Sequence, residues 1–119
     1  MAFLNKVFKK EDGVDVEEFL NHLDVEDEAM YEDADAFVKP VTLNDKADAD
    51  NVLTEAKQGN IVLVNIESLS KRNAIRLKEL ITEIKDGIVQ IDGDIARISS
   101  DKVLVTPSKV KIMKRKEAR

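Results

Sequence analysis

Four consecutive apolar residues, Ile-Val-Leu-Val at 61–64, mark the segment around which the rest of the chain is organised. Because they do not alternate with polar residues, they predict a strand that is buried on both faces, as at the middle of a sheet. Gly59 is expected to end a preceding helix, and Ser70 is placed to cap a following one. The segment from Gly59 to Leu69 therefore predicts a central strand between two helices.

Apolar residues recur at helical spacing on both sides of this strand. Residues 46–58 carry a narrow apolar stripe after a capping residue, Asn44 or Asp45. Residues 71–86 carry a broader stripe, and Gly87 is expected to end that helix. Both helices can cover the same face of the strand, and we expect a second copy of the chain to cover the other face.

Strand patterns lie before the first helix and after the second. Residues 36–43 predict an edge strand, because Pro40 cannot donate to hydrogen-bond ladders on both sides. The dipeptide Asp92-Gly93 predicts a two-residue hairpin turn between two strand segments. The strands expected after the second helix are 88–91, 94–98, 102–106 and 109–113.

The predicted fold class is α+β, an α/β sandwich with the order β-α-β-α-β-β-β. It contains a mixed sheet of about five strands with two helices on one face. A chain of 119 residues has room for one domain of roughly 80 residues, which buries only about 60% of its unfolded surface. Such a domain, with one sheet face uncovered, is expected to be dimeric. Ile75, which falls outside the helical stripe, marks a further candidate subunit contact.

Charge is segregated along the chain, although the formal net charge is only −5. Residues 1–10 carry +3, residues 11–35 carry −12, and residues 36–119 carry +4. Three blocks of alternating sign indicate three parts with different roles. We divide the chain accordingly into a distinct N-terminal segment at 1–12, an acidic flexible linker at 13–35 and a globular domain at 36–113. A basic tail at 114–119 follows the domain.

That N-terminal segment, residues 1–12, predicts an amphipathic membrane-targeting helix. Its apolar side chains recur at i, i+1, i+4 and i+5, so they share one face with lysines around it. A helix this short needs a surface to order it, and an anionic membrane would accept the phenylalanines and attract the lysines. The alternatives are a frayed start of the chain or a terminal helix docked on the protein's own core, although the long acidic segment separates these residues from that core. The predicted membrane-binding residues are Phe3, Leu4, Lys6, Val7, Phe8, Lys9 and Lys10.

A short helix is also expected within the acidic linker, near residues 15–24. Two interpretations are open: a transient helix on a tether, or a helix that touches a membrane or a partner. Glu17, Glu18 and Asp24 favour the tether, because an anionic membrane would repel them. The apolar residues at helical spacing are Val16, Phe19, Leu20 and Leu23.

The sequence lacks the residues of common catalytic and cofactor sites. It has no cysteine, and its one histidine, His22, lies in the acidic linker. The two common glycine-rich phosphate-binding motifs are absent from the sequence, and so is the calcium-loop pattern. We therefore expect no enzymatic activity, no cofactor and no metal site. Because no apolar run approaches the roughly 20 residues of a membrane span, and no signal-peptide core is found, a cytoplasmic protein is expected.

The basic C-terminus offers an alternative function, a small nucleic-acid-binding or generic protein-interaction module. Its cations could contact a phosphate backbone. However, the predicted strands carry no aromatic pair for base stacking, and the acidic segment would compete for a basic face. A solvated tail is the simpler interpretation, so no nucleic-acid partner is expected. The cations are Lys109, Lys111, Lys114, Arg115, Lys116 and Arg119.

Four motifs in succession resemble one protein family. They are Val-Leu-Val-Asn-Ile-Glu at 62–67, Asn-Ala-Ile-Arg-Leu at 73–77, Gly-Asp-Ile-Ala-Arg-Ile at 93–98 and Lys-Val-Leu-Val-Thr-Pro at 102–107. From Phe37 to Lys111, their order and spacing resemble the SepF family of cell-division adaptor proteins. Bacterial members often carry Gly-Gly where this chain has Asp92-Gly93. Their polymerising contact is therefore not expected here, and the chain looks more like archaeal members.

The resemblance implies a dimeric adaptor at the division site. Its first residues would bind the inner face of the cell membrane, and its domain would bind the C-terminal tail of the tubulin-like protein FtsZ. By motif position, the family's tail-binding residues correspond to Arg97 and Val103. From the residues alone, an apolar slot beside a basic group suits a peptide tail, and the alternative is a solvated arginine beside a core valine.

Overall fold

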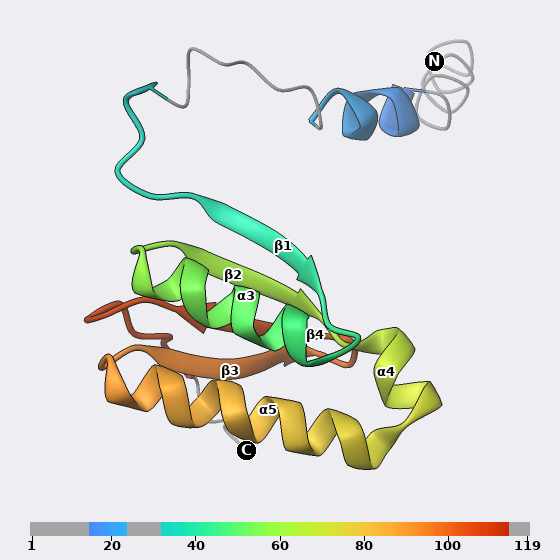
Figure 1. Ribbon diagram of the computed structural model, residues 1–119. Coiled ribbons are helices and arrows are strands. Elements are labelled where there is room, and N and C mark those ends of the chain that lie inside the picture. Colours follow the sequence, from blue (N-terminus) through green and yellow to red (C-terminus); the bar gives the residue numbers. More distant parts are fainter. Residues whose placement is uncertain (1–14, 24–31, 115–119) are drawn as a thin grey trace, which may run out of the picture. The chain divides into compact units, whose positions relative to one another are not determined.

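A computed structural model of the protein describes residues 15–23 and 32–114. The chain divides into two units, one up to Ala34 and one from Asp35 onward. In the first unit residues 15–22 form a helix, drawn in blue in Figure 1, so the short helix predicted near 15–24 is present. Residues 15–23 carry four exposed apolar side chains: Val16, Phe19, Leu20 and Leu23.

The second unit is built on one mixed sheet of four strands (Figure 1): β1 (Val38–Thr42), β2 (Ile61–Asn65), β3 (Asp94–Ser99) and β4 (Lys102–Thr106). Its described residues also form three helices: α3 (Lys46–Lys57), α4 (Glu67–Arg72) and α5 (Ala74–Gln90). The parallel strands β1 and β2 are connected through α3, whereas β2 pairs antiparallel with β4, and β4 with β3. The strand order β1-β2-β4-β3 places β2 inside the sheet and β1 and β3 at its edges.

Several predictions of the α+β fold are confirmed. The segment at 61–64 belongs to an inner strand, and the strand that contains Pro40 lies at an edge. The first helix is capped by Asp45, whose side chain accepts from the Asp48 amide, while the Asp48 side chain accepts from the Asp45 amide. This reciprocal capping box pairs amides that the first helical turn leaves without a partner.

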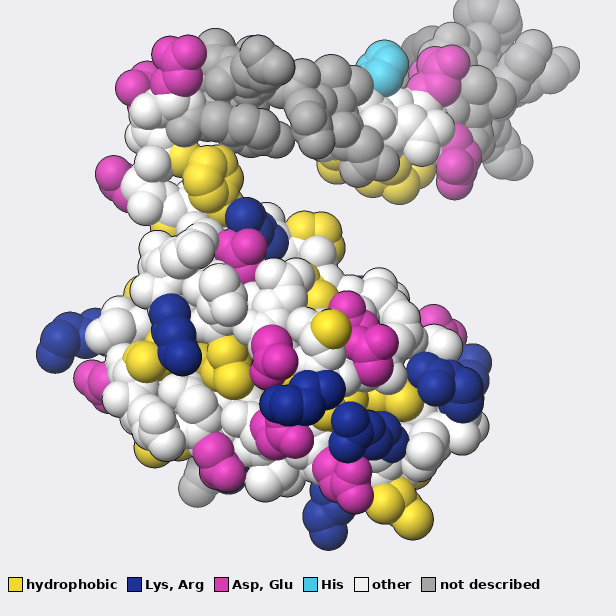
Figure 2. Space-filling model, viewed as in Figure 1, with side chains coloured by type: hydrophobic (Ala, Val, Ile, Leu, Met, Phe, Trp, Pro, Cys, Tyr) yellow, Lys and Arg dark blue, Asp and Glu magenta, His cyan; other side chains and the backbone are white. Residues whose placement is uncertain are grey.

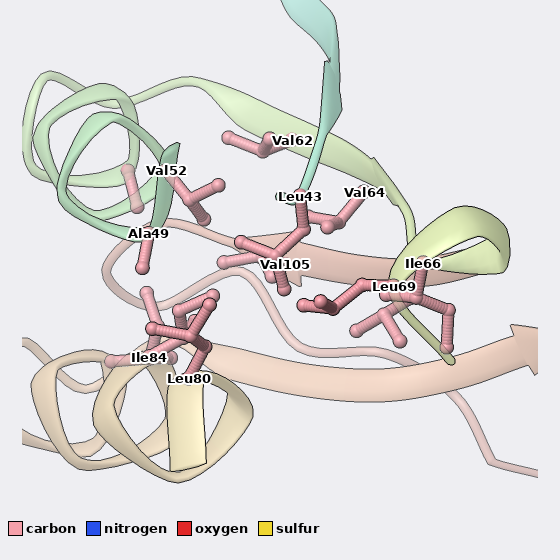
Figure 3. Packing of buried hydrophobic residues seen from close by; sticks show 13 residues of the cluster. Leu43, Ala49, Val52, Val62, Val64, Ile66, Leu69, Leu80, Ile84 and Val105 are labelled. Carbon is pink, nitrogen blue, oxygen red and sulfur yellow. The ribbon is translucent and has the colours of Figure 1, made fainter. Parts of the chain in front are cut away.

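Helices α3 and α5 pack on the same face of the sheet and form one hydrophobic core with it (Figure 3). On the sheet side, Val62 and Val64 of β2 lie opposite Val105 and Val103 of β4, and none of the four is more than 6% exposed. On the helix side, the buried residues are Ala49, Val52, Ala56, Leu80, Ile84 and Ile88.

The opposite face of the sheet has an apolar centre and is not covered by α3 or α5 (Figure 1). Leu63 of β2 and Leu104 of β4 are cross-strand partners on this face, and both are only half-buried. Val38, at 65% exposure, extends the apolar surface onto β1, where it pairs with Ile61. We call this surface the open sheet face.

The predicted boundaries of the second helix were wrong at both ends. Asn73, rather than Ser70, caps α5 by accepting a 3.0 Å hydrogen bond from the Arg76 amide, and the residues before it form the separate helix α4. At the other end α5 continues through Gly87 to Gln90, so this glycine does not end the helix. A Cβ at Gly87 would lie 2.6 Å from Leu53 Cδ2, so glycine here allows α3 and α5 to approach closely.

The predicted hairpin at Asp92-Gly93 was also wrong, because this dipeptide ends α5. The Asp92 amide donates to the Val89 carbonyl, and the Gly93 amide donates to the Ile88 carbonyl, each at 3.0 Å. With Asp92 at a φ of 63°, this is the Schellman arrangement that closes a helix. A Cβ at Gly93 would clash with the Thr106 carbonyl oxygen.

The sheet therefore has four strands rather than about five. Residues 88–91, predicted as a strand, belong to the end of α5, and residues 109–113 form no strand. The hairpin of this fold lies between β3 and β4, which turn at Ser100 and Asp101.

Candidate functional site

A solvent-open groove of about 390 Å³ lies between the helices α4 and α5 and the strands β3 and β4. We call it the groove. Its surface is mostly apolar, with two cationic side chains. The residues that line it are Ile66, Ser70, Leu77, Ile81, Lys85, Ile95, Ala96, Arg97 and Val103.

The helical wall of the groove is one stripe of α5. Leu77, Ile81 and Lys85 are spaced four residues apart, so they project from the same side of the helix. Leu77 and Ile81 are half-buried and pack against the core, whereas Lys85 is exposed. The wall is therefore apolar along two turns and basic at the third.

The sheet wall contains both residues that were predicted to bind a peptide tail. Arg97 of β3 and Val103 of β4 are direct cross-strand partners and both line the groove. Val103 is 6% exposed and also belongs to the core, while Arg97 is exposed. Their burial alone agrees with either interpretation of the sequence. Their position in a common groove is the feature that favours a binding site.

Arg97 is held at the β3–β4 turn by backbone carbonyls. Its Nε donates to the Ser99 carbonyl at 3.0 Å, and its Nη2 donates to the Ser100 carbonyl at 2.6 Å. Neither Arg97 nor Lys85 forms an ion pair with a carboxylate among the described residues. Two cations without an acidic partner in this part of the chain favour an anionic ligand group in the groove.

Asp94, the first residue of β3, fixes the C-terminal segment beside this strand. Its carboxylate accepts from the Ile112 amide at 2.9 Å and from Lys114 Nζ at 2.8 Å, and it also accepts from the Ile95 amide. The Lys114 ammonium and these amides lower the pKa of Asp94 to about 2. Asp92 is anchored similarly by Lys111 Nζ at 2.9 Å, which lowers its pKa as well.

Sequence reasoning did not single out the helical wall of the groove. The spacing of Leu77, Ile81 and Lys85 was visible in the sequence, but it does not reveal which strand the helix approaches. Ser70 was predicted as a cap, whereas its hydroxyl donates to the Glu67 carbonyl within α4 and the residue lines the groove.

The other predicted site residues lie outside the part of the chain that the structure describes. These are Phe3, Leu4, Lys6, Val7, Phe8, Lys9 and Lys10. Over residues 15–23 and 32–114, no helix is long and apolar enough to cross a membrane, and no cluster of three or more potential ligands could hold a metal ion. Figure 2 shows acidic and basic side chains interspersed on the visible face of the second unit, with apolar patches between them.

Fold and groove together define a small mixed α+β domain with a concave site suited to an apolar ligand that carries negative charge. The chain belongs to the SepF family, because the family model described as cell division protein SepF matches residues 38–112. It is therefore a cell-division protein.

Two solved structures of archaeal proteins agree with this family. The SepF-like protein from Pyrococcus furiosus is 29% identical, with a TM-score of 0.62, over 67% of this chain and 96% of that chain. The SepF-like protein from Archaeoglobus fulgidus has the same TM-score at 20% identity, over 70% of this chain and 99% of that chain, and shows the shared fold. The chain is thus a SepF member of archaeal type. No curated protein matched the chain.

Proposed function

We propose that this chain is a non-enzymatic adaptor that tethers FtsZ to the membrane during cell division. In this proposal the groove binds the C-terminal tail of FtsZ, and residues 1–12 bind the inner face of the cell membrane at the division site. One observation carries the proposal. Arg97 and Val103, the positions that correspond to the family's tail-binding residues, are cross-strand partners in one apolar groove.

The groove has the chemistry that a peptide tail requires. Apolar side chains of the tail would lie against Leu77, Ile81 and Val103, and full burial of one such side chain contributes about 1.5–3 kcal/mol. Lys85 and Arg97 would attract an acidic side chain or a terminal carboxylate, which fixes the direction of the bound chain. The groove volume falls within the range of roughly 300–1,000 Å³ that is usual for ligand sites.

A homodimer would give the adaptor two grooves. We assign the subunit contact to the open sheet face, where Leu63 and Leu104 are half-buried neighbours in the single chain. Burial of this face by a second copy would compensate for the small core of a domain of this size. Two grooves that engage two tails of one FtsZ polymer would raise the overall affinity without any new contact.

Membrane attachment is assigned from the chemistry of residues 1–12, which lie outside the described residues. Phe3 and Phe8 would enter the boundary between headgroups and acyl chains. Each of Lys6, Lys9 and Lys10 would contribute about 1 kcal/mol near an anionic surface. Two such segments in a dimer would hold the membrane more firmly than one.

A binding titration of the full-length chain with a fluorescent FtsZ tail peptide tests the groove assignment. We expect Arg97→Glu to weaken binding at least about tenfold, equal to 1.4 kcal/mol, because it places a negative charge beside the acidic group of the tail.

Lys78→Glu supplies a matched control for this titration. Lys78 is an exposed residue of α5 that does not line the groove and has no ion pair among the described residues. The same charge change at this position should alter the affinity by less than about threefold, as is usual for a peripheral charge. Equal affinities for Arg97→Glu and the unmodified chain would rule out the groove assignment.

A further inference from the structure

The two edges of the sheet differ in their ability to accept another strand. The edge strand β1 has Pro40 at its centre, which lacks an N–H group, and Lys39 beside it. Both features protect an edge against strand addition. The opposite edge strand, β3, contains neither proline nor lysine. The edge that lacks a central proline and a lysine is therefore the one that borders the groove.

Backbone groups along the middle of β3, apart from the Ile95 amide, are available to a ligand. Residues 95–98 form no backbone–backbone hydrogen bond with any described segment other than β4. The Ile95 amide donates to the Asp94 carboxylate, which indicates that Ile95 directs its backbone groups away from β4. Because this direction alternates along an antiparallel strand, Arg97 also presents its N–H and C=O groups outward.

The same two residues connect this edge to the groove. Ile95 and Arg97 both line the groove with their side chains while their backbone groups point outward from the sheet. A strand added beside β3 would lie about 4.8 Å from it, with every second side chain on the groove side. Those side chains would face the wall formed by Leu77 and Ile81, with Lys85 and Arg97 close to any acidic neighbour.

We infer that the groove binds its peptide as an added β-strand along β3. This inference rests on the proposed function and specifies how the tail is held. The occupant is an extended peptide with apolar side chains at i and i+2 and an acidic group next to them. Main-chain hydrogen bonds to the Ile95 carbonyl and to the N–H and C=O groups of Arg97 supply affinity, because the Ile95 amide already donates to Asp94, and the apolar and cationic walls select the side chains.

A backbone-methylation scan of the tail peptide tests this binding mode. Each amide of the peptide is methylated in turn, which removes one N–H donor and leaves the side chains unchanged, and each peptide is titrated into the full-length protein. Added-strand binding predicts a loss of at least about tenfold for methylation at alternate amides within the bound segment, and less than about threefold for the amides between them.

Hydrogen exchange of the protein amides supplies a second readout. Binding of the unmodified peptide should slow exchange at the Arg97 amide on β3 and leave the outward-facing amides of Val38 and Thr42 on the protected edge β1 unchanged. Tight binding by all methylated peptides, with no change at Arg97, would overturn the added-strand mode and leave the groove assignment standing. Failure of the unmodified peptide to bind would overturn both.

Discussion

Asp94 connects several backbone and side-chain groups at the start of β3. It begins β3, and its carboxylate bonds the backbone of Ile95 and of Ile112 as well as the ammonium of Lys114. Its side chain is only 19% exposed, so these contacts are shielded better than those of a typical surface ion pair. One carboxylate thus fixes the start of the edge strand and the C-terminal segment together.

Asp94→Asn should destabilise the fold in a pH-dependent way. The carboxyl pKa is about 2 in the folded chain against an ordinary value of 3.8. The ionised group therefore stabilises the fold above pH 3.8, and this contribution is lost as the pH falls toward 2. At pH 7 we expect the substitution to lower the free energy of unfolding by about 1–2 kcal/mol.

Urea unfolding at pH 7, 4 and 2 measures this effect. The difference between the two proteins should shrink progressively below pH 4 and become small at pH 2, because about half of the folded-state Asp94 carboxyls and nearly all of the unfolded-state ones are then protonated. A difference that is equal at all three pH values would show that the charge of Asp94 does not stabilise the fold.

At the scale of elements, local sequence patterns predicted most of the helices and strands of this fold. They failed where the same pattern is compatible with two different local structures. Asp92-Gly93 supplies the positive φ angle that both a tight hairpin and a helix end require. Gly87 resembled a helix stop, but its lack of a side chain accommodates Leu53 of α3, a tertiary contact that no local pattern contains. Ile88 is β-branched, a feature that favours a strand, yet it lies fully buried in the helix α5.

The same contrast between local sequence signals and tertiary contacts applies to the candidate site. Arg97 and Val103 were located through motifs whose order the fold preserves, and their pairing follows from the register of a local hairpin. Lys85 and the apolar stripe before it could not be assigned to the site, because the approach of α5 to β3 is set by packing in the core. The sequence therefore placed Arg97 and Val103 together and did not reveal the helical wall that faces them, and the role of this groove in tail binding stays a prediction.

The open sheet face leads to a prediction about assembly. Leu104→Asp places a charge at its centre, opposite Leu63, and should weaken the proposed homodimer at least about tenfold, since burial of one leucine contributes about 1.5–3 kcal/mol. Val89→Asp makes a similar change at an exposed position of α5 and should leave the dimer intact.

Sedimentation equilibrium measures both association constants, and circular dichroism verifies that each variant is folded. If the unmodified chain sediments as a monomer, or if a folded Leu104→Asp variant dimerises normally, then the open sheet face is not the subunit contact.

At the scale of the whole molecule, the alternation of charge along the sequence agrees with the proposed tether. The acidic block at 11–35 separates a basic, apolar beginning from the domain that carries the groove. Its like charges discourage such a segment from lying on an anionic membrane. The proposal thus gives each block one role: membrane contact, separation and recognition of the FtsZ tail.

Co-sedimentation of FtsZ with vesicles that contain anionic lipid tests this tethering most directly. Three proteins are compared: the full chain, the chain without residues 1–12, and Arg97→Glu. FtsZ should reach the pellet with the full chain only. Arg97→Glu should bind the vesicles itself but leave FtsZ in solution, and the shortened chain should leave both in solution. Equal recovery of FtsZ in the pellet with all three proteins would contradict the account.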